Sequence, residues 1–517
     1  MLGVLRTIIY VVVLFLLGGL AFRALYPVPT DTSREVSRAI PPSADTTLGA
    51  AVLPQVAAHP GLSGVSRLQD GHVSYAARIQ LADMAEQSID ARYYIWQRDI
   101  SGLLLLDAMK RAADRGVRVR LLLDDNGIPD LDAELAEMDA HENIEVRIFN
   151  PFVLRSPRML SYLFDFSRLN RRMHNKSMTV DGVATIVGGR NVGDIYFSTN
   201  TEVNYFDLDV VALGDAAQDV ADDFDLYWAS DSAVPADLIL PARPADGGLL
   251  DAAVQEVRAR PGAEAYAEDV RSLPLRDEIL DDTRAFEWVP MQMVSDDPAK
   301  GLGQAGEEDL MITRLLKLVE RPTREAVLIS AYFVPGDRLT DILVDWARSG
   351  VEVMTLTNAQ EATDVLPVHS GYRKYRDRLV DAGVDVRELR SDLQKRELWE
   401  QFGLTGSTNT SLHAKTFVLD DDEIFVGSFN FDPRSARLNT EMGFLIESPT
   451  IAQAFTNQIT ANLDRWTYSV SRGADGELDW RRSAEGETTL YETEPKTTAL
   501  SRWLVRFMGV LPIEWML

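Results

Sequence analysis

The stretch Met173–Asn191 reads MHNKSMTVDGVATIVGGRN, and a related stretch, Leu412–Asn430, reads LHAKTFVLDDDEIFVGSFN. Each places a histidine and a lysine two residues apart, followed by an aspartate and by a run containing glycine that ends in asparagine. These residues are His174, Lys176, Asp181 and Asn191 in the first copy and His413, Lys415, Asp420 and Asn430 in the second. The histidines are 413 − 174 = 239 residues apart, and so are the asparagines, 430 − 191 = 239. This shared register indicates an internal duplication.

The segments around the two copies alternate between apolar strands and amphipathic helices. In the first half we expect strands at 89–96, 117–123 and 144–149, and in the second half the same order recurs at 326–333, 351–356 and 384–389. Strands that alternate with helices predict βαβ units. The expected fold is therefore α/β: two pseudo-symmetric tandem domains with mainly parallel or mixed sheets flanked by helices, each with one copy of the motif.

Length and composition limit the classes of function. A chain of 517 residues is too long for one hydrophobic core, so at least two packed units are expected. The formal net charge of −27 argues against a nucleic-acid binder, because such proteins attract phosphate backbones with basic surface. The chain has no cysteine, which excludes disulfides and thiolate metal sites. Any binding of phosphate must depend on local positive charge.

The N-terminal segment 1–25 is predicted to be a transmembrane anchor. No charged residue lies between Thr7 and Phe22, a run that gives about 24 Å of helix. A cleaved signal peptide is the alternative. The other predicted units are a linker rich in Pro, Ser, Thr and Ala at 26–64, a first domain at 65–229, an acidic helical insert at 230–308, a second domain at 309–470 and a tail at 471–517.

The C-terminal tail contains one amphipathic helix. Apolar residues recur at helical spacing from about residue 499 to residue 511, with Arg502 and Arg506 on other faces. This pattern fits two interpretations equally well: a helix docked on the protein core, or a helix that lies on a membrane surface.

The repeated motif suits chemistry at a phosphate. Residues two apart on a strand point to the same face, so each histidine is expected to lie beside its lysine. A neutral imidazole can attack an electrophile, and an ammonium can hold a phosphate oxygen. The asparagines could donate to the same oxygens. In covalent phosphoryl transfer one histidine attacks phosphorus while the other protonates the leaving oxygen, and side chains stabilise the charge, so no metal or other cofactor is expected.

A histidine nucleophile also needs a carboxylate on its other ring nitrogen. Glu202 in NTEVN and Glu441 in NTEMG each follow their histidine by 28 residues, since 202 − 174 and 441 − 413 are equal. They are the preferred candidates for this role. Asp207, in YFDLDV, is the second choice in the first half.

Arginines near both motifs could supply the positive charge that the acidic chain otherwise lacks. They are Arg168, Arg171, Arg172, Arg434 and Arg437. We expect them to face an anionic head group. The segment Asp296–Gly301, DDPAKG, has the look of a phosphate-side loop, although a plain turn is the stronger interpretation.

At these residues the chain resembles the phospholipase D superfamily, whose HxKxxxxD signature followed by G-[GS]-x-N is matched in both halves. Within that superfamily it looks most similar to bacterial cardiolipin synthases of the C class. LNRRMHNKS, DDPAKG, SLHAKTF, GSFNFDPRS, LNTEMGF and the closing LPIEW carry this similarity.

The resemblance implies a bilobal fold with one shared active site and a metal-independent phosphatidyl-histidine intermediate. It implies that His174 and His413 are nucleophile and general acid/base, in an order that the sequence leaves open. The lysines and asparagines of the motif would hold phosphate oxygens, Glu202 and Glu441 would orient the imidazoles, and Asp181 and Asp420 would support the motif. Gly189 stands where the second copy has Ser428, so the two halves need not have equal roles.

The expected function is that of a cardiolipin synthase-type phosphatidyltransferase, with phosphatidylglycerol as acceptor and phosphatidylglycerol or phosphatidylethanolamine as donor. The alternative is hydrolysis by a phospholipase D, with a nuclease ranked lower and a non-catalytic lipid-binding protein lower still. The expected partners are these phospholipids and a membrane, without nucleic acid, and the need for an accessory protein is left open. The expected location is the bacterial inner membrane, by a single N-terminal pass or peripherally.

Overall fold

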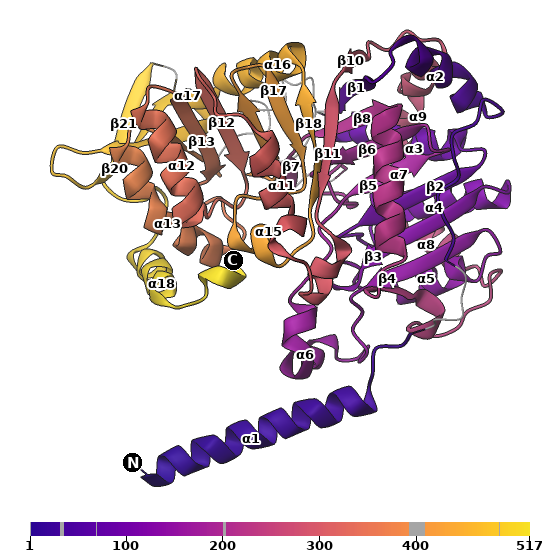
Figure 1. Cartoon of the computed structure of the whole chain (residues 1–517), viewed down its shortest axis with the longest axis horizontal. Coiled ribbons are helices and arrows are strands. Elements are labelled where there is room, and N and C mark those ends of the chain that lie inside the picture. Colours follow the sequence, from indigo (N-terminus) through magenta and orange to yellow (C-terminus); the bar gives the residue numbers. More distant parts are fainter. Residues whose placement is uncertain (1, 31–35, 69, 200–202, 392–408, 485) are drawn as a thin grey trace.

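The computed structural model describes residues 2–30, 36–68, 70–199, 203–391, 409–484 and 486–517. It has two lobes, one from each half of the chain, with the N-terminal helix lying below them in Figure 1. Each lobe is built on one large sheet. The second lobe follows the first along the chain, and the two meet along strands near the centre of the view.

The first sheet contains β1 (Ser63–Leu68), β2 (Ser88–Tyr93), β3 (Arg118–Asp124), β4 (Ile144–Phe149), β5 (Ser177–Val180), β6 (Ala184–Gly188), β8 (Asp209–Leu213), β9 (Ala233–Pro235) and β10 (Glu287–Val289). Their order is β10-β1-β8-β6-β5-β2-β3-β4-β9. The second sheet contains β11 (Met291–Ser295), β12 (Glu325–Ser330), β13 (Glu352–Asn358), β14 (Asp385–Leu389), β16 (Lys415–Leu419), β17 (Glu423–Gly427), β18 (Met442–Glu447), β19 (Thr467–Arg472), β20 (Leu478–Ala484) and β21 (Glu487–Tyr491). Their order is β11-β18-β17-β16-β12-β13-β14-β19-β20-β21.

The two sheets share one topology. The order β1-β8-β6-β5-β2-β3-β4 of the first sheet corresponds strand by strand to β11-β18-β17-β16-β12-β13-β14 of the second. The predicted α/β fold with tandem domains is thus confirmed. Both sheets are mixed, which is one of the two arrangements expected from the sequence. Parallel pairing joins β2, β3 and β4, and likewise β12, β13 and β14, whereas the other pairs within the two sheets are antiparallel.

The helices that cover the sheets are α2 (Thr47–Ala58), α3 (Gly71–Met84), α4 (Ile100–Asp114), α5 (Asp132–Asp139), α6 (Ser161–Leu169), α7 (Asp215–Trp228), α8 (Leu249–Arg258), α9 (Ala263–Ser272), α10 (Leu275–Leu280), α11 (Met311–Leu318), α12 (Gly336–Arg348), α13 (Leu366–Asp381), α15 (Pro433–Arg437), α16 (Pro449–Thr460), α17 (Leu463–Trp466) and α18 (Ala499–Val510). Local signals explain their ends. Asp99 caps α4 by accepting a hydrogen bond from Gly102 N at 2.9 Å, and Gly116 follows that helix with a left-handed φ of 97°.

The antiparallel part of each sheet follows from the turn inside the motif. Asp181 and Gly182 between β5 and β6, and Asp420 and Asp421 between β16 and β17, all have positive φ. Two central residues with positive φ make the tight turn that matches the twist of a hairpin. The Asp181 carboxylate also accepts hydrogen bonds from the backbone N–H groups of residues 86–88. The motif aspartate therefore fixes the hairpin to the sheet.

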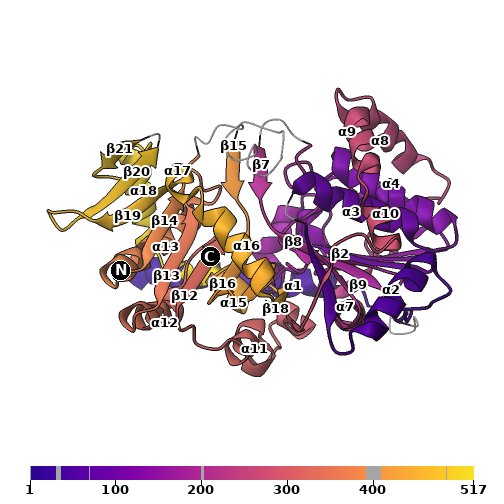
Figure 2. The ribbon, with the colours of Figure 1, turned by 90° about the horizontal axis from the view of Figure 1, so that it is seen from above.

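Several elements join the lobes. The chain passes from β10 in the first sheet directly to β11 in the second. The parallel pair of β7 (Val203–Phe206) and β15 (Asn409–Leu412) takes one strand from each half, and the two strands lie side by side in Figure 2. One hydrophobic cluster contains side chains of both sheets, such as Val187 with Val426. The lobes therefore share a core at their interface.

The segments outside the repeats also pack on the body. α2, in the segment predicted to be a linker, buries Leu48 and Val52 completely. In the segment 230–308, α8 contacts α4, whereas α9 and α10 contact α3.

The N-terminal segment forms α1 (Leu2–Leu25). Within the described ranges of the chain, no helix combines the length and the apolar content needed to cross a membrane. The prediction of a transmembrane helix at 1–25 is therefore not confirmed.

Candidate active site

His174 lies just before β5, where the chain of the first half contacts the second. Its backbone N–H donates to Thr440 O at 2.8 Å, and its ring Nδ1 lies 2.8 Å from Glu441 Oε2. From the sequence we expected Glu441 to orient His413, the histidine of its own half. The structure instead places it on the histidine of the other half.

His413 lies just before β16, and its contacts are equivalent to those of His174. Its backbone N–H donates to Phe206 O at 2.9 Å, and its Nδ1 lies 2.5 Å from Asp207 Oδ2. Glu202, the first choice for a carboxylate in this half, lies outside the described residues. Asp207, the second choice, is the carboxylate that contacts His413 among the described residues. Each histidine is held by a carboxylate from the opposite half of the chain.

The lysines of the motif lie under the imidazoles. Lys176 Nζ donates to His174 O at 2.5 Å, and Lys415 Nζ lies 2.8 Å from His413 Nδ1. Both lysine side chains are almost wholly buried. The Lys415 charge lowers the pKa of His174, and the Lys176 charge lowers that of His413, so the two motifs act on one another electrostatically. The two copies form a single site.

Burial and the two ammonium groups keep the imidazoles neutral. Burial, followed by the charges of the lysines, moves the pKa of His174 well below its usual range and the pKa of His413 to about 4. Burial also lowers the pKa of Lys176 to about 7 and lowers that of Lys415. A neutral imidazole has the free lone pair that attack on phosphorus requires. An anionic phosphate beside either lysine raises the pKa of that lysine and favours its charged form.

The two carboxylates differ in their electrostatic state. Burial raises the pKa of Glu441 to about 7, and the Lys176 charge only partly offsets this effect. Burial would raise the pKa of Asp207 too, but Lys415 and His413 hold it below its usual value. Asp207 is therefore ionised throughout the neutral range, whereas Glu441 titrates within it.

The difference between Gly189 and Ser428 has a steric cause. A Cβ on Gly189 would lie 2.1 Å from Asp207 Oδ1, so only glycine fits beside that carboxylate. In the second half, Ser428 Oγ donates to Glu441 Oε2 at 2.5 Å and accepts from Met442 N at 3.0 Å. In the first half the Asp207 carboxylate therefore occupies the space that the Ser428 hydroxyl occupies in the second half.

The two asparagines are buried in different environments. Asn191 Nδ2 donates to the hydroxyl of Tyr196 at 3.1 Å, and its Oδ1 accepts from Ile95 N at 3.1 Å. Asn430 is 3% exposed, and its Oδ1 has no hydrogen-bond partner among the described residues. A buried amide with an unused polar atom is costly unless a ligand satisfies the group. The unused Oδ1 of Asn430 is an acceptor, which suits a hydroxyl donor, whereas a phosphate oxygen would need the Nδ2 donor of an amide.

The motif aspartates lie away from the imidazoles. Asp181 bonds the backbone of residues 86–88, and Asp420 accepts from the backbone N–H groups of residues 323–325. We infer a supporting role for both. Two aromatic rings were missed by the sequence analysis: Tyr94 meets the ring of His174 edge-on at 5.1 Å, and Tyr196 meets that of His413 at 5.2 Å. Tyr94 shares the 239-residue offset of the repeat with Phe333, since 333 − 94 = 239, but neither tyrosine lies within the motif.

The DDPAKG loop is more than a plain turn. Asp296 Oδ2 accepts from the backbone N–H of Glu441 at 2.8 Å and from Lys300 Nζ at 2.8 Å. Lys300 also donates to Ser435 O at 2.9 Å, and both side chains are fully buried. The loop does not hold a phosphate in this arrangement. It supports the backbone of the residue that orients His174.

The arginines near the motifs are mostly engaged within the protein. Arg172 is buried against Asp124 at 2.9 Å, Arg168 pairs with Asp165, and Arg434 donates to Asn170. A buried guanidinium needs such a carboxylate or carbonyl partner to offset its desolvation. The expectation that all five face a head group is wrong for these three. Arg437 pairs with Glu307 at the exposed surface.

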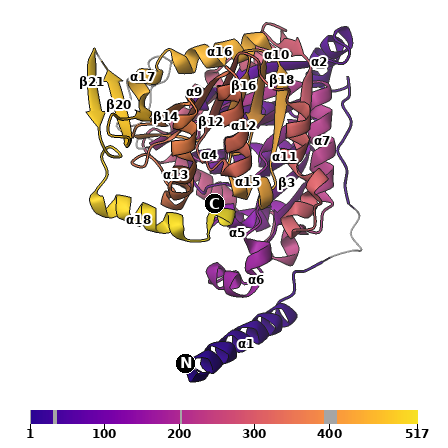
Figure 3. The same cartoon turned by 60° about the vertical axis from the view of Figure 1, so that its left-hand side comes forward.

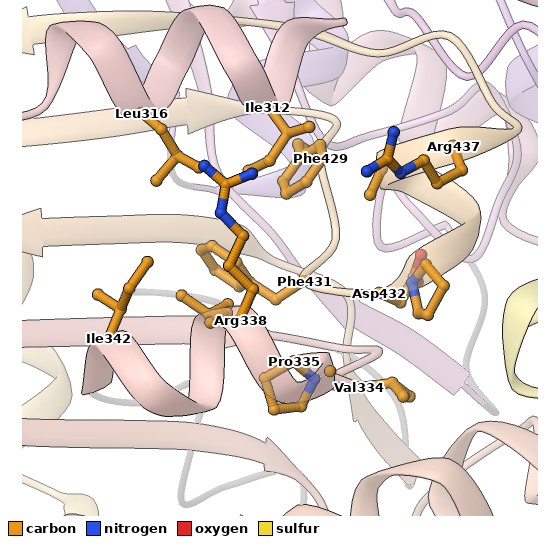
Figure 4. A pocket seen from close by; sticks show the side chains of 14 residues that line it. Ile312, Leu316, Val334, Pro335, Arg338, Ile342, Phe429, Phe431, Asp432 and Arg437 are labelled. Carbon is orange, nitrogen blue, oxygen red and sulfur yellow. The ribbon is translucent and has the colours of Figure 1, made fainter. Parts of the chain in front are cut away.

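An apolar pocket of about 160 Å³ lies behind the second motif, between α11, α12 and α15. Phe429 and Phe431, which flank Asn430 in sequence, form part of its lining. In Figure 4 the Arg338 side chain extends toward Leu316 and Ile312, and Arg437 lies at the right. The histidines and lysines of the motif are not among its lining residues. The pocket is therefore separate from the groups that would react.

Two homologous halves that each contribute a buried histidine and lysine to one site, with the orienting carboxylates exchanged between them, define the class of protein as a tandem enzyme of the phospholipase D type. A family model described as "Cardiolipin synthase, PLD-like domain" matches residues 79–228 and 315–463. The chain belongs to this family of cardiolipin synthases with phospholipase D-like domains.

Individual relatives agree with this assignment. The chain is 43% identical to cardiolipin synthase C of Escherichia coli K12 over 481 residues. This alignment covers 91% of this chain and 99% of the relative. It is 26% identical to a cardiolipin synthase of Oceanobacillus iheyensis over 78% of this chain and 70% of the relative. Among solved structures, a phosphatidylserine synthase of Haemophilus influenzae matches with a TM-score of 0.54 at 14% identity, over 91% of this chain and 100% of that one. That likeness concerns the fold alone.

Proposed function

We propose that this protein is a cardiolipin synthase that transfers a phosphatidyl group from a donor phospholipid to phosphatidylglycerol. The observation that carries the proposal is the single buried site built from both His–Lys motifs, in a chain that aligns almost end to end with a cardiolipin synthase. The donor is phosphatidylglycerol or phosphatidylethanolamine.

The reaction takes place in two displacements at phosphorus. First, Nε2 of one histidine forms a bond to phosphorus as the bond from phosphorus to the head-group oxygen breaks, and the other histidine gives that oxygen a proton. Glycerol or ethanolamine leaves. The second histidine then takes the proton from a hydroxyl of phosphatidylglycerol, whose oxygen displaces the nitrogen from phosphorus. Cardiolipin forms and both imidazoles are restored.

The remaining residues of the site stabilise charge and geometry. Lys176, Lys415 and the amide of Asn430 would bind the equatorial oxygens as they gain charge in the transition state. Glu441 and Asp207 would accept the Nδ1–H of His174 and His413, which leaves Nε2 of each ring to face the substrate. Ser428 supports Glu441.

The same intermediate would serve a hydrolase if water replaced the lipid acceptor. Phospholipase D activity is therefore the alternative outcome of every assay, and it is recognised by phosphatidic acid as the product. The alignment over 99% of a cardiolipin synthase favours the transferase.

The test is expression in a bacterial strain from which the endogenous cardiolipin synthases have been deleted. We expect cardiolipin to reappear with the wild type and to fall by at least about 10³-fold with His174→Ala or His413→Ala, because either change removes a group that acts as part of a unit. Formation of phosphatidic acid in place of cardiolipin would support the hydrolase. Purified enzyme with defined lipids, with and without phosphatidylethanolamine, then identifies the donor.

We further propose that the protein works at the bacterial inner membrane, because its substrates are held in a bilayer. Support comes from the apolar composition of the N-terminal segment and from the amphipathic C-terminal helix.

A further inference from the structure

Exposed large apolar side chains are concentrated on a few elements of the described chain. Besides those of α1, they gather on α6 and the turn before it, and on α18 with the residues that follow. In the first group Leu163 is 51% exposed, and in the second Phe507 is 48% exposed. Contiguous apolar exposure of this extent marks an interaction surface.

Each helix is linked to the end of a parallel strand in its own half, although these two strands are not counterparts of one another. α6 follows β4, and α18 is held at the end of β13 by a hydrogen bond from Gln360 Nε2 to Ser501 Oγ at 2.6 Å. Both helices lie on the side of the molecule where α1 lies, as Figures 1 and 3 show. They therefore flank the carboxyl ends of the parallel strands, which is the edge where α/β proteins bind their ligands.

Short chains of contacts connect each helix to one histidine. On α6, Tyr162 donates to Asn126 Oδ1 at 3.2 Å, Asn126 Nδ2 donates to the hydroxyl of Tyr94 at 3.2 Å, and Tyr94 packs on His174. In the second half, Asn358 at the end of β13 makes hydrogen bonds of 3.1 Å to both backbone groups of Leu412, the residue before His413. Each helix is therefore positioned relative to the motif of its own half.

Charge near α18 has the opposite sign from the rest of the chain. Residues 495–510 contain one lysine and two arginines without an acidic residue, whereas the whole chain has a net charge of −27. The arginines near α6 are mostly paired with aspartates, such as Arg155 with Asp125 and Arg158 with Asp132, so the contribution of α6 is apolar. A negatively charged membrane surface would repel most of this protein and attract the α18 segment. An amphipathic helix with basic flanks lies in the plane of such a surface.

We propose that α6 and α18 form a bilayer-docking surface, one helix from each half, which seats the carboxyl edges of both sheets on an anionic phospholipid membrane. The surface consists of Leu160, Leu163 and Phe166 on the first side and Trp503, Phe507 and Val510 on the second. This inference rests on the proposed function, because a lipid substrate must reach the histidines from the bilayer. It adds which face of the protein meets the lipid.

The test uses the absence of native cysteine, so that a single introduced cysteine can carry a fluorophore sensitive to its environment. The full chain is labelled at Leu163→Cys, at Phe507→Cys and, as a control, at Leu490→Cys on β21, which is 53% exposed but lies away from the two helices. Vesicles of phosphatidylglycerol and phosphatidylethanolamine are then added. We expect a blue shift and a several-fold gain in emission at the first two positions and no change at the third.

Three results would overturn the proposal. One is no change at positions 163 and 507, and another is an equal change at 490. The third is a change that follows protein concentration without lipid, which would show that the surface joins two copies of the chain.

A second measurement compares activity on two forms of substrate. The double variant Leu163→Glu/Phe507→Glu should form cardiolipin from vesicles at a rate at least tenfold below that of the wild type. Its rate on short-chain phospholipids dispersed as monomers should stay unchanged. Leu490→Glu should keep both activities. Equal losses on both substrates would contradict docking. If the wild type forms no cardiolipin from either substrate, the proposed function fails, whereas the fluorescence result still decides the docking surface.

Discussion

Two residues that occupy equivalent positions in the site do not have equivalent chemistry. Asp207 is kept ionised by Lys415 and His413, whereas burial raises the pKa of Glu441 to about 7. Glu441 also takes a hydrogen bond from Ser428, a residue whose counterpart in the first half is Gly189. Because the orienting groups differ, the two histidines have different proton affinities in the working enzyme. The pseudo-symmetry of the fold therefore does not extend to the ionisation of the two orienting carboxylates.

The first prediction concerns pH. Glu441 becomes an ionised acceptor for His174 as pH rises through about 7, and Lys176, whose pKa burial also lowers to about 7, loses its charge over the same range. Since kcat/KM reports the free enzyme, it should follow a bell with its maximum near neutral pH. Both variants should keep some activity whose pH profile can be measured. Glu441→Gln should flatten the acid limb of that profile, and Lys176→Arg should flatten its alkaline limb. Profiles that keep both limbs in both variants would refute the assignment.

The second prediction concerns the space beside Asp207. Gly189→Ser would push that carboxylate away from His413, because the new Cβ would lie 2.1 Å from its Oδ1. A displacement of this order should lower kcat by roughly 10²-fold. Ser428→Gly, the reciprocal change, removes one hydrogen bond to Glu441 without a clash and should cost about tenfold. Steady-state kinetics on both variants decide the order, and a larger loss in Ser428→Gly would contradict the steric argument.

At the level of elements, the segment between the repeats contributes directly to the site. The loop that follows β11 brings Asp296 and Lys300 beneath Glu441, so a segment outside both motifs fixes the backbone that orients His174. The Asp296–Lys300 ion pair of this loop is buried, and Lys300 Nζ also donates a hydrogen bond to Ser435 O. It acts as a structural brace.

The third prediction tests this brace. Lys300→Met leaves the buried Asp296 carboxylate without its cation and should lower the free energy of unfolding by about 3–5 kcal/mol. Because Asp296 also holds the backbone N–H of Glu441, kcat should fall as well. The control is Lys317→Met, which removes an exposed pair with Glu308 and should change neither quantity measurably. Denaturant unfolding and turnover are the measurements; similar values for both variants would show that the loop is only a turn.

At the level of the whole molecule, the duplication yields one site instead of two. Each half supplies a histidine and a lysine, and each supplies the carboxylate for the other half. The lobes are further joined by the β7–β15 pair and by a common hydrophobic cluster. Neither half could therefore form a competent site alone.

The fourth prediction follows from this exchange. Purified His174→Ala and His413→Ala, mixed in equal amounts, should show no more activity than either variant alone, because each folded chain lacks one of its two imidazoles. Cardiolipin formation on mixed lipid vesicles is the measurement. Recovery of activity on mixing would mean that halves of different chains combine by domain swapping.

Much of this arrangement could be predicted from the order of residues. The equal spacing of His174 to Asn191 and of His413 to Asn430 indicates a duplication, and local periodicity places β2–α4–β3 and β12–α12–β13 correctly. These features depend on neighbours within a few residues, and sequence patterns report such neighbours well. Pairing between strands is different. Each sheet is mixed because a tight turn, at Asp181 and Gly182 in the first half and at Asp420 and Asp421 in the second, makes each motif a hairpin.

The sequence by itself determined that the chain is a duplicated α/β protein, and it indicated the two histidines and two lysines that the fold brings together. Only the tertiary structure decided the partners of these residues. It placed Glu441 on His174 and Asp207 on His413, and it paired Arg172 with Asp124 and Lys300 with Asp296. The physical reason is that a buried charge is satisfied by whichever group the fold brings within hydrogen-bond distance. Here most of those groups lie far along the chain, where no local pattern can indicate them.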